Sequence, residues 1–359
     1  MARTTRKKSN KVAKKKKNVV AVDLFCGVGG LSHGFVLEGL KVAAGIDLDP
    51  ACEFAYESNN NGKFIKQDIS KVTGKDLKKL FKGADIKVLA GCAPCQPFST
   101  YSNRYNQERD NKWNLLSQFS RLVREANPQI VTMENVPALE KHPVFMTFVR
   151  SLRRQHYEVW HDVIDCSQYG VPQTRKRLVL LASKLDKLAL IPPTSKKAVS
   201  VKRAIGKLPS IKAGQTHKKD KMHTAAGLDA INLERIKVSK PGKTWRVWPK
   251  GMIAKCHRQK SGKTFSGVYG RMTWGDPAPT MTTQCYGYGS GRFGHPRQHR
   301  AISLREAAIL QSFPRRYKFL KRGETASITT LGRLIGNAVP VKLGRAIAKS
   351  IQLHIKAHA

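Results

Sequence analysis

The stretch DLFCGVGG, residues 23–30, lies between a run of apolar residues and a pattern typical of an amphipathic helix. Its glycines, Gly27, Gly29 and Gly30, remove side chains where a strand must turn sharply, and they let a ligand approach the main chain. The spacing is G-x-G-G and not the G-x-G-x-x-G of dinucleotide-binding turns. Because glycine-rich turns are often only turns, the stretch by itself predicts a strand, a turn and a helix that open an α/β domain.

Apolar runs and helical patterns alternate from this stretch to residue 182. We expect strands at residues 19–25, 41–47, 87–90, 129–133 and 177–182, and helices at residues 31–38, 50–58, 113–126 and 144–155. Such alternation indicates a mostly parallel α/β sheet with helices on both faces. The pattern ends near Lys184 and resumes as helices at residues 303–311, where Ser303 and Glu306 can form a capping box, and at 341–355.

The chain is strongly basic, with 66 Lys and Arg against 24 Asp and Glu and a net charge of +42, so we expect a polyanion as its partner. Nine of these cations and no acid lie in residues 1–17, which predicts a disordered basic arm. Whether the arm anchors DNA, directs nuclear import or is only solvated stays open. Residues 184–276 hold 22 Lys and Arg against five acids, which indicates a basic, loop-rich second domain.

The cysteines and the apolar residues indicate the cellular compartment. The sequence has no run of eighteen apolar residues and no apolar core of a signal peptide, so we expect neither a membrane span nor secretion. Seven cysteines, an odd and scattered number, suit free thiols in a reducing cytosol.

Two acidic residues follow strands as expected for an adenosine-type cofactor. Asp47 ends the second expected strand about twenty residues after the glycine turn, where a carboxylate can accept hydrogen bonds from both ribose hydroxyls. Asp68 follows a third apolar run, where it can accept from an adenine amino group or cap a helix N-terminus. The spacing does not decide between these two roles.

Five motifs, in this order, resemble those of the DNA cytosine-5 methyltransferases: DLFCGVGGLSHGF (23–35), GCAPCQPFS (91–99), MENV (133–136), QTRKR (173–177) and IGNAVP (335–340). The resemblance covers about residues 18–183 and 277–352, and the basic stretch 184–276 has the position of that family's target-recognition domain. It implies a Rossmann-like, S-adenosylmethionine-dependent methyltransferase sheet in residues 18–183, completed by residues 277–359, with a smaller, basic, loop-rich recognition domain.

The resemblance implies S-adenosylmethionine as the cofactor. Its adenine would stack on Phe25, its ribose would meet Asp47 and its amino group would meet Asp68. Its methionine end would meet the glycine turn and Asn337. A cofactor without a pyrophosphate accounts for the absence of the dinucleotide spacing.

Cys95 could be a metal ligand, half of a redox pair with Cys92, or a nucleophile. A zinc site needs a second pair of ligands, and the other close pair, Cys256 and His257, is adjacent and badly spaced, so we expect no metal. Prolines on both sides of Cys95 argue against the helix start on which a redox C-x-x-C lies. The resemblance implies that Cys95 is the nucleophile, whose thiolate adds to C6 of cytosine so that C5 can be methylated.

Glu134 and two arginines complete the implied catalytic set. Addition to C6 leaves negative charge on N3 and O2, so an acid at N3 lowers the barrier, and Glu134 ends a strand expected beside that of Cys95. Arg175 and Arg177 are two residues apart at the start of a strand and should share a face. The resemblance implies that they reach O2 and the catalytic loop, although one of them could touch only phosphate.

Reaction at C5 requires the base to leave the duplex stack. Residues 99–111 form a long polar segment between two expected elements, as a closing lid would. Aromatic residues lie among the cations of the basic stretch, and we expect at least half of them to form its core. The candidate DNA contacts are Gln96, Ser99, Arg271, Thr282, Thr283, Gln284 and Arg292.

These inferences predict an enzyme that methylates C5 of a flipped-out cytosine in a specific duplex DNA sequence, through a covalent adduct between Cys95 and C6. A tRNA cytosine-5 methyltransferase and an inactive DNA-binding regulator stay as alternatives. The insert of about ninety residues favours duplex DNA, because a short site needs a dedicated reader. We expect a monomer in the cytoplasm, at the nucleoid, or in the nucleus of a eukaryotic host, with any cognate restriction endonuclease acting separately.

Overall fold

The computed structural model describes residues 17–94 and 109–358, and for residues 109–114 the main chain alone. In this part of the chain the central sheet has seven strands in the order β3-β2-β1-β4-β5-β8-β6. They are β1 (Val19–Leu24), β2 (Lys41–Asp47), β3 (Lys63–Lys66), β4 (Ile86–Gly91), β5 (Ile130–Asn135), β6 (Glu158–Asp165) and β8 (Lys176–Ser183). Strands β1 to β5 are parallel, and β8 runs antiparallel to β5 and β6. The expected mostly parallel α/β sheet is confirmed.

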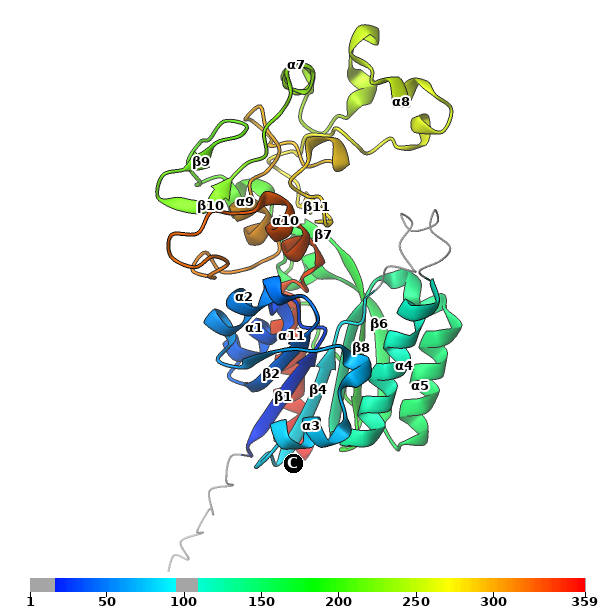
Figure 1. Cartoon of the computed structure of the whole chain (residues 1–359). Coiled ribbons are helices and arrows are strands. Elements are labelled where there is room, and N and C mark those ends of the chain that lie inside the picture. The colour runs from blue at the N-terminus through cyan, green and yellow to red at the C-terminus, as the bar shows by residue number, and fades with distance from the viewer. Residues whose placement is uncertain (1–16, 95–108, 359) are drawn as a thin grey trace, which may run out of the picture.

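Helices cover both faces of this sheet (Figure 1). One face packs against α1 (Gly30–Leu37), α2 (Glu53–Asn60) and α11 (Val341–His358), and the other against α3 (Gly74–Leu80), α4 (Arg109–Ala126) and α5 (Pro143–Arg154). Successive residues of a strand point to opposite faces. Ala21 therefore packs in the cluster of Phe35, whereas Val20 and Val22 pack in the cluster of Phe119. Burial on both faces explains why the β1 sequence is an unbroken apolar run.

A second, less regular part stands opposite the carboxyl ends of the parallel strands (Figure 1). It contains small two-stranded pairs, β7 (Gln173–Thr174) with β11 (Ala278–Pro279) and β9 (Thr216–His217) with β10 (Asp220–Thr224), and the helices α6 (Val201–Ile205), α7 (Ala230–Val238), α8 (Lys255–Arg258), α9 (Leu304–Leu310) and α10 (Ile328–Asn337). The expected capping box at the start of α9 is confirmed: Ser303 accepts from the Glu306 N–H, and Glu306 accepts from the Ser303 N–H.

This second part, which we call the recognition part after the domain expected at residues 184–276, has a small core of its own, formed by Ile236, Trp245, Trp248, Tyr288 and Ala301. Trp245 and Trp248 of the basic stretch are thus core residues and Tyr269 packs against them, in line with the expectation for at least half of its aromatics. Tyr288 and Ala301 come from beyond residue 276, so the segment after the expected boundary contributes to the same core. The boundaries at 183 and 276 stay predictions.

The parallel strands run upward in Figure 1, away from the lower end of the molecule, where β1 begins and α11 ends. Their carboxyl ends, where ligands bind in open α/β sheets, therefore face the recognition part. Among the described residues, no helix combines the length and the apolar character that crossing a bilayer requires.

Candidate active site at the carboxyl edge of the sheet

The glycine turn after β1 has a backbone that few residues can adopt. Phe25, Gly27 and Gly29 have φ values of 57°, 51° and 82°, in the left-handed region. A Cβ on Gly29 would lie 2.3 Å from Nδ2 of Asn60, whereas one on Gly27 would meet nothing within 4 Å. Gly29 therefore permits close packing within the protein, and Gly27 leaves open space beside the main chain. A non-glycine residue at positive φ, such as Phe25, is a backbone feature that clusters at functional sites.

The third glycine of this turn joins two motifs that lie about 300 residues apart in sequence. A Cβ on Gly30 would lie 2.1 Å from the carbonyl oxygen of Val339, so the main chain of the IGNAVP motif packs directly on the start of α1. Asn337, the last residue of α10, is exposed next to this contact. The structure thus brings the glycine turn and Asn337 into one neighbourhood, as the resemblance implies.

Asp47 is fixed at the end of β2 by the main chain around it. Its Oδ2 accepts from the Gly27 N–H at 2.8 Å, and its Oδ1 accepts from the Asp49 N–H at 3.0 Å. Each carboxylate oxygen retains a lone pair for a further donor. The next residue, Leu48, is 63% exposed, which is unusual for a large apolar side chain beside a charged site. Leu48 was not among the residues that the sequence singled out.

Asp68 has the capping role that the sequence left open. Its Oδ1 accepts from the Ser70 N–H at 2.8 Å, at the start of a short 3₁₀ helix. This hydrogen bond lowers the pKa of the Asp68 carboxyl. The capping alternative is confirmed, and the contact with a cofactor amino group stays a prediction.

Asp23 is a buried acid that sequence analysis missed, although it opens the DLFCGVGG stretch. It is 1% exposed; its Oδ2 accepts from the Ser32 hydroxyl at 2.7 Å, and its Oδ1 is buried without a hydrogen-bond partner. Burial raises the pKa of the Asp23 carboxyl to about 7. Among the described residues, this buried oxygen without a hydrogen-bond partner belongs to the strand residue that leads into the glycine turn.

Glu134 and Arg177 form an ion pair at the carboxyl edge of the sheet. Arg177 Nε lies 2.9 Å from Glu134 Oε1, and both side chains are largely buried, at 12% and 8% exposure. Glu134 is in β5 and Arg177 is in β8, the antiparallel neighbour of β5. Two of the expected catalytic residues are therefore brought together.

The strand that leads to Cys95 is tied to the end of β5. Asn135 donates from Nδ2 to the carbonyl oxygen of Ala93 at 2.9 Å, and it accepts from the Val136 N–H. Cys95, Gln96 and Ser99, as well as most of the expected lid, lie outside the described residues. Burial and the neighbouring Glu134 carboxylate hold the pKa of the Cys92 thiol well above its ordinary value. Cys92 thus stays protonated near neutral pH, as a packed thiol does.

Arg175 is buried two residues before Arg177. It lies between β7 and β8, it is 2% exposed, and its Nη1 donates to the carbonyl oxygen of Met281 at 2.8 Å. Its Nη2 lies 3.5 Å from the carbonyl oxygen of Ala338. Burial raises the pKa of the Cys166 thiol, and the positive charges of Arg175 and Arg177 both oppose this rise, so both guanidinium groups lie near that thiol. That the two arginines share one face stays a prediction, and Arg175 also links the recognition part to the IGNAVP motif.

Two buried glutamines complete this junction and were not expected from the sequence. Gln173 donates from Nε2 to Oε1 of Gln311 at 2.8 Å, and it accepts from the Met281 N–H at 2.9 Å. Gln311 donates in turn to the carbonyl oxygen of Ile335 at 2.8 Å. The QTRKR and IGNAVP motifs are therefore linked through the side-chain amide of Gln311, which explains why Gln173 is polar in a buried place.

Comparison with known proteins identifies the family. The sequence profile described as "C-5 cytosine-specific DNA methylase" matches residues 19–353. The chain belongs to this family. It is a DNA cytosine-5 methyltransferase.

Related sequences and structures agree with the family. The Type II methylase M.HgiDII of Herpetosiphon aurantiacus is 52% identical over 336 residues, which cover 92% of this chain and 94% of the relative. The Type II methyltransferase M1.BsuMI of Bacillus subtilis is 32% identical, with 91% and 78% covered. A prophage-encoded DNA modification methyltransferase candidate of E. coli has the same fold, with a TM-score of 0.72 at 23% identity, covering 94% of this chain and 99% of that one.

The methyltransferase exposes some of its expected DNA contacts and buries another. Thr282, Thr283, Gln284 and Arg292 are exposed. Arg271 is 5% exposed, and its guanidinium donates to main-chain carbonyl oxygens of Ile236, Ser239, His295, Pro296 and Gln298. Because these bonds occupy all three nitrogens of its guanidinium, Arg271 stabilises the recognition part and is not one of the DNA contacts that the sequence predicted. In the described part of the methyltransferase, no group of three His, Cys, Asp or Glu could hold a metal ion.

Proposed function

We propose that the enzyme transfers a methyl group from S-adenosylmethionine to C5 of a cytosine that is swung out of a specific duplex DNA sequence, through a covalent bond between Cys95 and C6. In this proposal the methylation protects a site from a separate restriction endonuclease, which the similarity to Type II methyltransferases supports. The observation that carries the proposal is the buried pair of Glu134 and Arg177, 2.9 Å apart at the strand ends next to the segment that leads to Cys95.

The residues at the end of β1 and β2 fit the proposed cofactor. Asp47 offers acceptors for ribose hydroxyls, and the exposed Leu48 offers an apolar surface for an adenine ring, with Phe25 as the second such surface. The open space over Gly27 and the exposed amide of Asn337 suit the methionine end. When bound, S-adenosylmethionine supplies an electrophilic methyl group, which C5 accepts.

The chain's own residues activate the base. The Cys95 thiolate forms a bond to C6, and the electron pair of the C5–C6 double bond moves toward C5 and, by resonance, N3 and O2. Glu134 holds a proton at N3, while Arg177, beside it, donates to O2 and offsets the charge that develops there. After C5 is methylated, a water molecule takes the C5 proton, the electron pair of that C–H bond re-forms the C5–C6 double bond, and the Cys95 sulfur leaves C6 as a thiolate, while Glu134 keeps the proton that it shared with N3.

Transfer of tritium from labelled S-adenosylmethionine tests this function. We expect label in duplex DNA and none in tRNA, and bisulfite sequencing of the methylated DNA then gives the target site. Label in tRNA alone would favour the tRNA enzyme. A protein that binds duplex DNA without any transfer would be a regulator.

A further inference from the structure

Helices α4 and α5 form a groove on the outer side of the sheet domain. Its volume is about 610 Å³, and both helices run from the carboxyl edge of the sheet toward the lower end of the molecule (Figure 1). The buried rings of Phe119 and Phe148 lie with their centres 5.4 Å apart, and the Ser120 hydroxyl donates to the Ser151 hydroxyl at 2.9 Å. The groove is therefore built on two firmly packed helices.

Cations and hydroxyl groups line this groove. Among the described residues that form its lining, four are arginines, four carry a hydroxyl group and none is Asp or Glu. The arginines are Arg121 and Arg124 of α4 and Arg150 and Arg154 of α5. Guanidinium and hydroxyl groups can all donate hydrogen bonds, and the guanidinium groups are always charged. Such a lining suits an anion that offers several oxygen acceptors.

One of these arginines is occupied within the protein. Arg121 Nη1 lies 3.0 Å from Glu125 Oε1, and Arg121 Nη2 donates to the carbonyl oxygen of Val72 at 2.9 Å. In the described part of the chain, no carboxylate forms an ion pair with the other three, which are all exposed: Arg124, Arg150 and Arg154. Arg150 Nη2 donates to the Thr147 hydroxyl at 3.3 Å. Most donors of these three guanidinium groups are thus available to a ligand.

The available arginines are spaced to meet a row of phosphates. Arg150 and Arg154 are one turn apart on α5, which is about 6 Å along the helix axis. A DNA strand has one phosphate per about 3.4 Å of the duplex axis, so arginines at this spacing can each meet a phosphate of the same strand. The planar guanidinium group also binds two phosphate oxygens at once. Carboxylates of an acidic peptide lie on flexible side chains without a fixed spacing, so the groove fits a nucleic-acid backbone better.

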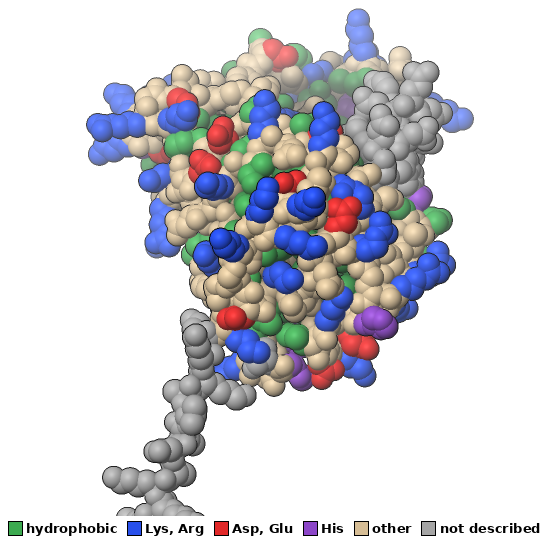
Figure 2. Space-filling view, turned by 60° about the horizontal axis from the view of Figure 1, so that its bottom comes forward, with side chains coloured by type: hydrophobic (Ala, Val, Ile, Leu, Met, Phe, Trp, Pro, Cys, Tyr) green, Lys and Arg blue, Asp and Glu red, His purple; other side chains and the backbone are tan. Residues whose placement is uncertain are grey.

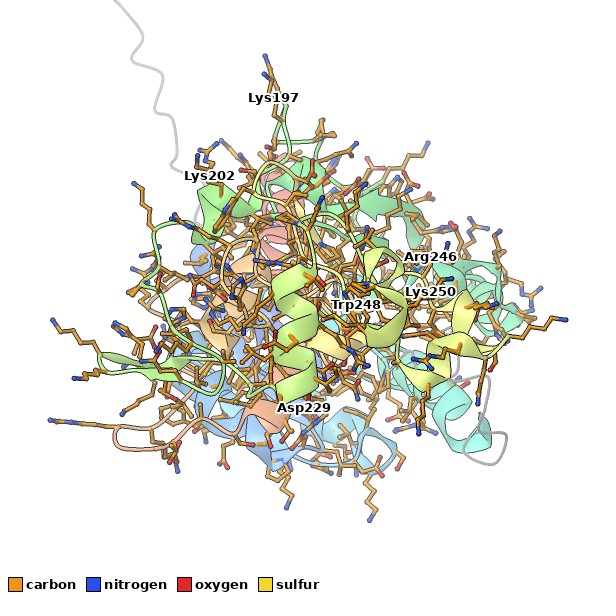
Figure 3. The ribbon with its side chains drawn as sticks, turned by 90° about the horizontal axis from the view of Figure 1, so that it is seen from above. Lys197, Lys202, Asp229, Arg246, Trp248 and Lys250 are labelled. Atoms are coloured by element: carbon orange, nitrogen blue, oxygen red, sulfur yellow. The ribbon has the colours of Figure 1, made fainter. Side chains whose placement is uncertain are left out.

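The groove is well separated from the place of the target cytosine. Arg124 lies in the last turn of α4, about 20 Å along the axis from the first residue of this helix. In Figure 3, seen from above, the recognition part with Arg246, Trp248 and Lys250 lies in front of the sheet domain, so the target duplex of the proposed function is held on that upper side. Figure 2 shows that Lys and Arg are also spread over the lower face of the enzyme. DNA in the groove would therefore be a segment other than the target.

We propose that the groove between α4 and α5 binds the phosphate backbone of a second DNA segment, without reading its sequence. Arg124, Arg150 and Arg154 pair with the phosphates, and the exposed Ser117 hydroxyl adds a neutral donor. Such a contact lets the enzyme hold one segment of a long DNA while the carboxyl edge of the sheet binds or releases another. This inference goes beyond the proposed methyl transfer. An acidic peptide in the groove is an alternative outcome of the tests below.

Modification of arginines by phenylglyoxal tests the groove without any substitution. Peptide mapping gives the rates at Arg150 and Arg154, and at Arg153, an exposed neighbour on α5 that does not line the groove. One equivalent of a short duplex with the mapped target site should leave all three rates unchanged. A duplex without that site, added at about ten times its dissociation constant, should then slow modification of Arg150 and Arg154 by about tenfold, because only the free groove reacts. The rate at Arg153 should not change.

Three outcomes of this experiment would overturn the proposal. They are protection that is complete after the first equivalent of target duplex, no protection by the second duplex, and equal slowing at Arg153. Polyglutamate with the same number of charges should leave the rates unchanged, and protection as strong as that by the duplex would assign the groove to an acidic peptide instead. None of these measurements needs methyl transfer, so failure here is distinct from failure of the proposed function.

Salt dependence tests the charges of the groove. The enzyme is saturated with the short target duplex, and a labelled duplex without the target is titrated. In Arg150→Ala/Arg154→Ala, the slope of log affinity against log salt should flatten by about 2. The control Arg153→Ala/Lys349→Ala removes the same charge from exposed positions of α5 and α11 outside the groove, and should keep the slope.

The control also separates binding from helix stability. Arg153 and Arg154 both lie in the last turn of α5, so an effect through the helix dipole would appear in both alanine variants. Arg150→Lys/Arg154→Lys keeps both charges and should keep the slope of the unmodified enzyme. Equal slopes in the two alanine variants would overturn the proposal.

Discussion

At the scale of single residues, the contact between Glu134 and Arg177 relates the structure to the reaction. In the proposed mechanism, the carboxylic acid that protonates N3 of cytosine needs a neighbouring group that holds its orientation and stabilises negative charge on O2. Arg177 meets both needs from the adjacent strand, at 2.9 Å from Glu134 Oε1. Arg175 also donates to main-chain oxygens of the loops around residues 281 and 338.

Glu134→Gln removes the exchangeable carboxyl proton and keeps the shape of the side chain. We expect kcat to fall by roughly 10²- to 10⁴-fold, because general acid catalysis at N3 is lost. Binding of the duplex should change little. Single-turnover methylation together with a DNA-binding titration separates the two effects. The control is Glu53→Gln, which changes an exposed residue at the start of α2; a similar loss in both variants would contradict the role of Glu134.

The buried Asp23 makes stability depend on pH. Its pKa is raised to about 7 in the folded protein, so between about pH 4 and 7 the native state keeps a proton that the unfolded chain has lost. The contribution of Asp23 to the free energy of unfolding is therefore greatest below about pH 4. It falls by about 1.4 kcal/mol per pH unit between about pH 4 and 7, and it is constant above about pH 7.

Asp23→Asn should remove that dependence. When unfolding by urea is measured from pH 5 to 8, the free energy of unfolding of the variant should rise with pH, relative to that of the unmodified enzyme, by up to about 3 kcal/mol. Asp162→Asn, at an exposed position of β6, should run parallel to the unmodified enzyme at every pH. A constant difference between Asp23→Asn and the unmodified enzyme would mean that Asp23 is ionised in the folded state.

The sequence predicts residue types at the site better than it predicts their environment. The motifs located Glu134, Asp47 and the glycine turn, because the chemistry of the family fixes those residue types. They could not separate Arg177, which pairs with Glu134, from Arg271, whose guanidinium is buried against main-chain carbonyls. Burial of an arginine depends on loops far away in sequence, which local patterns do not reveal.

At the scale of elements, the junction between the start of α1 and the loop after α10 decides the geometry of the site. The main chain of Val339 comes so close to Gly30 that no side chain fits between them. Gln311 holds the same loop through the carbonyl oxygen of Ile335. The main chain around Asn337 is thereby held next to the glycine turn.

Gly30→Ala should disturb this junction. Its new Cβ would lie 2.1 Å from Val339 O, so the backbone of α1 or of the loop must move. We expect a loss of about 1–3 kcal/mol in the free energy of unfolding, as for overpacked sites, and weaker binding of S-adenosylmethionine. At Gly227, a Cβ would meet nothing within 4 Å, so Gly227→Ala serves as the control. Equal thermal stability of the two variants would refute the close contact.

Sequence analysis did not predict β6, a strand in which polar and apolar residues are mixed. β6, EVWHDVID, lies at the edge of the sheet and is only partly buried, so it lacks the apolar run that marks β1 and β5. The reversed direction of β8 also has no local signal, because an apolar strand reads the same in either direction. Both features follow from how the chain returns across the sheet after α5.

At the scale of the whole molecule, the charge of +42 acts together with the two-part shape. The composition predicts a polyanion as partner but not the surface that meets it, because lysines and arginines are spread over the face seen in Figure 2 as well as over the basic stretch. The recognition core draws on residues both before and after position 276, so composition alone could not mark where that part ends.

Binding to duplex DNA should weaken steeply with salt. Raising the salt from about 50 to 200 mM should lower the affinity by about 10³-fold or more, because each phosphate contact releases counterions. Fluorescence anisotropy with a labelled duplex measures this over a series of salt concentrations. An affinity that stays constant over that range would exclude a major role for the basic surface.

Covalent catalysis by Cys95 is tested most directly by trapping. A duplex with 5-fluorocytosine at the mapped target keeps a fluorine where the C5 proton must leave, so the bond between sulfur and C6 cannot be released. With S-adenosylmethionine present, we predict a complex that survives denaturation, and a peptide that carries the modified base on Cys95. Absence of that complex at saturating duplex and cofactor, or attachment of the base to any other residue, would contradict the mechanism.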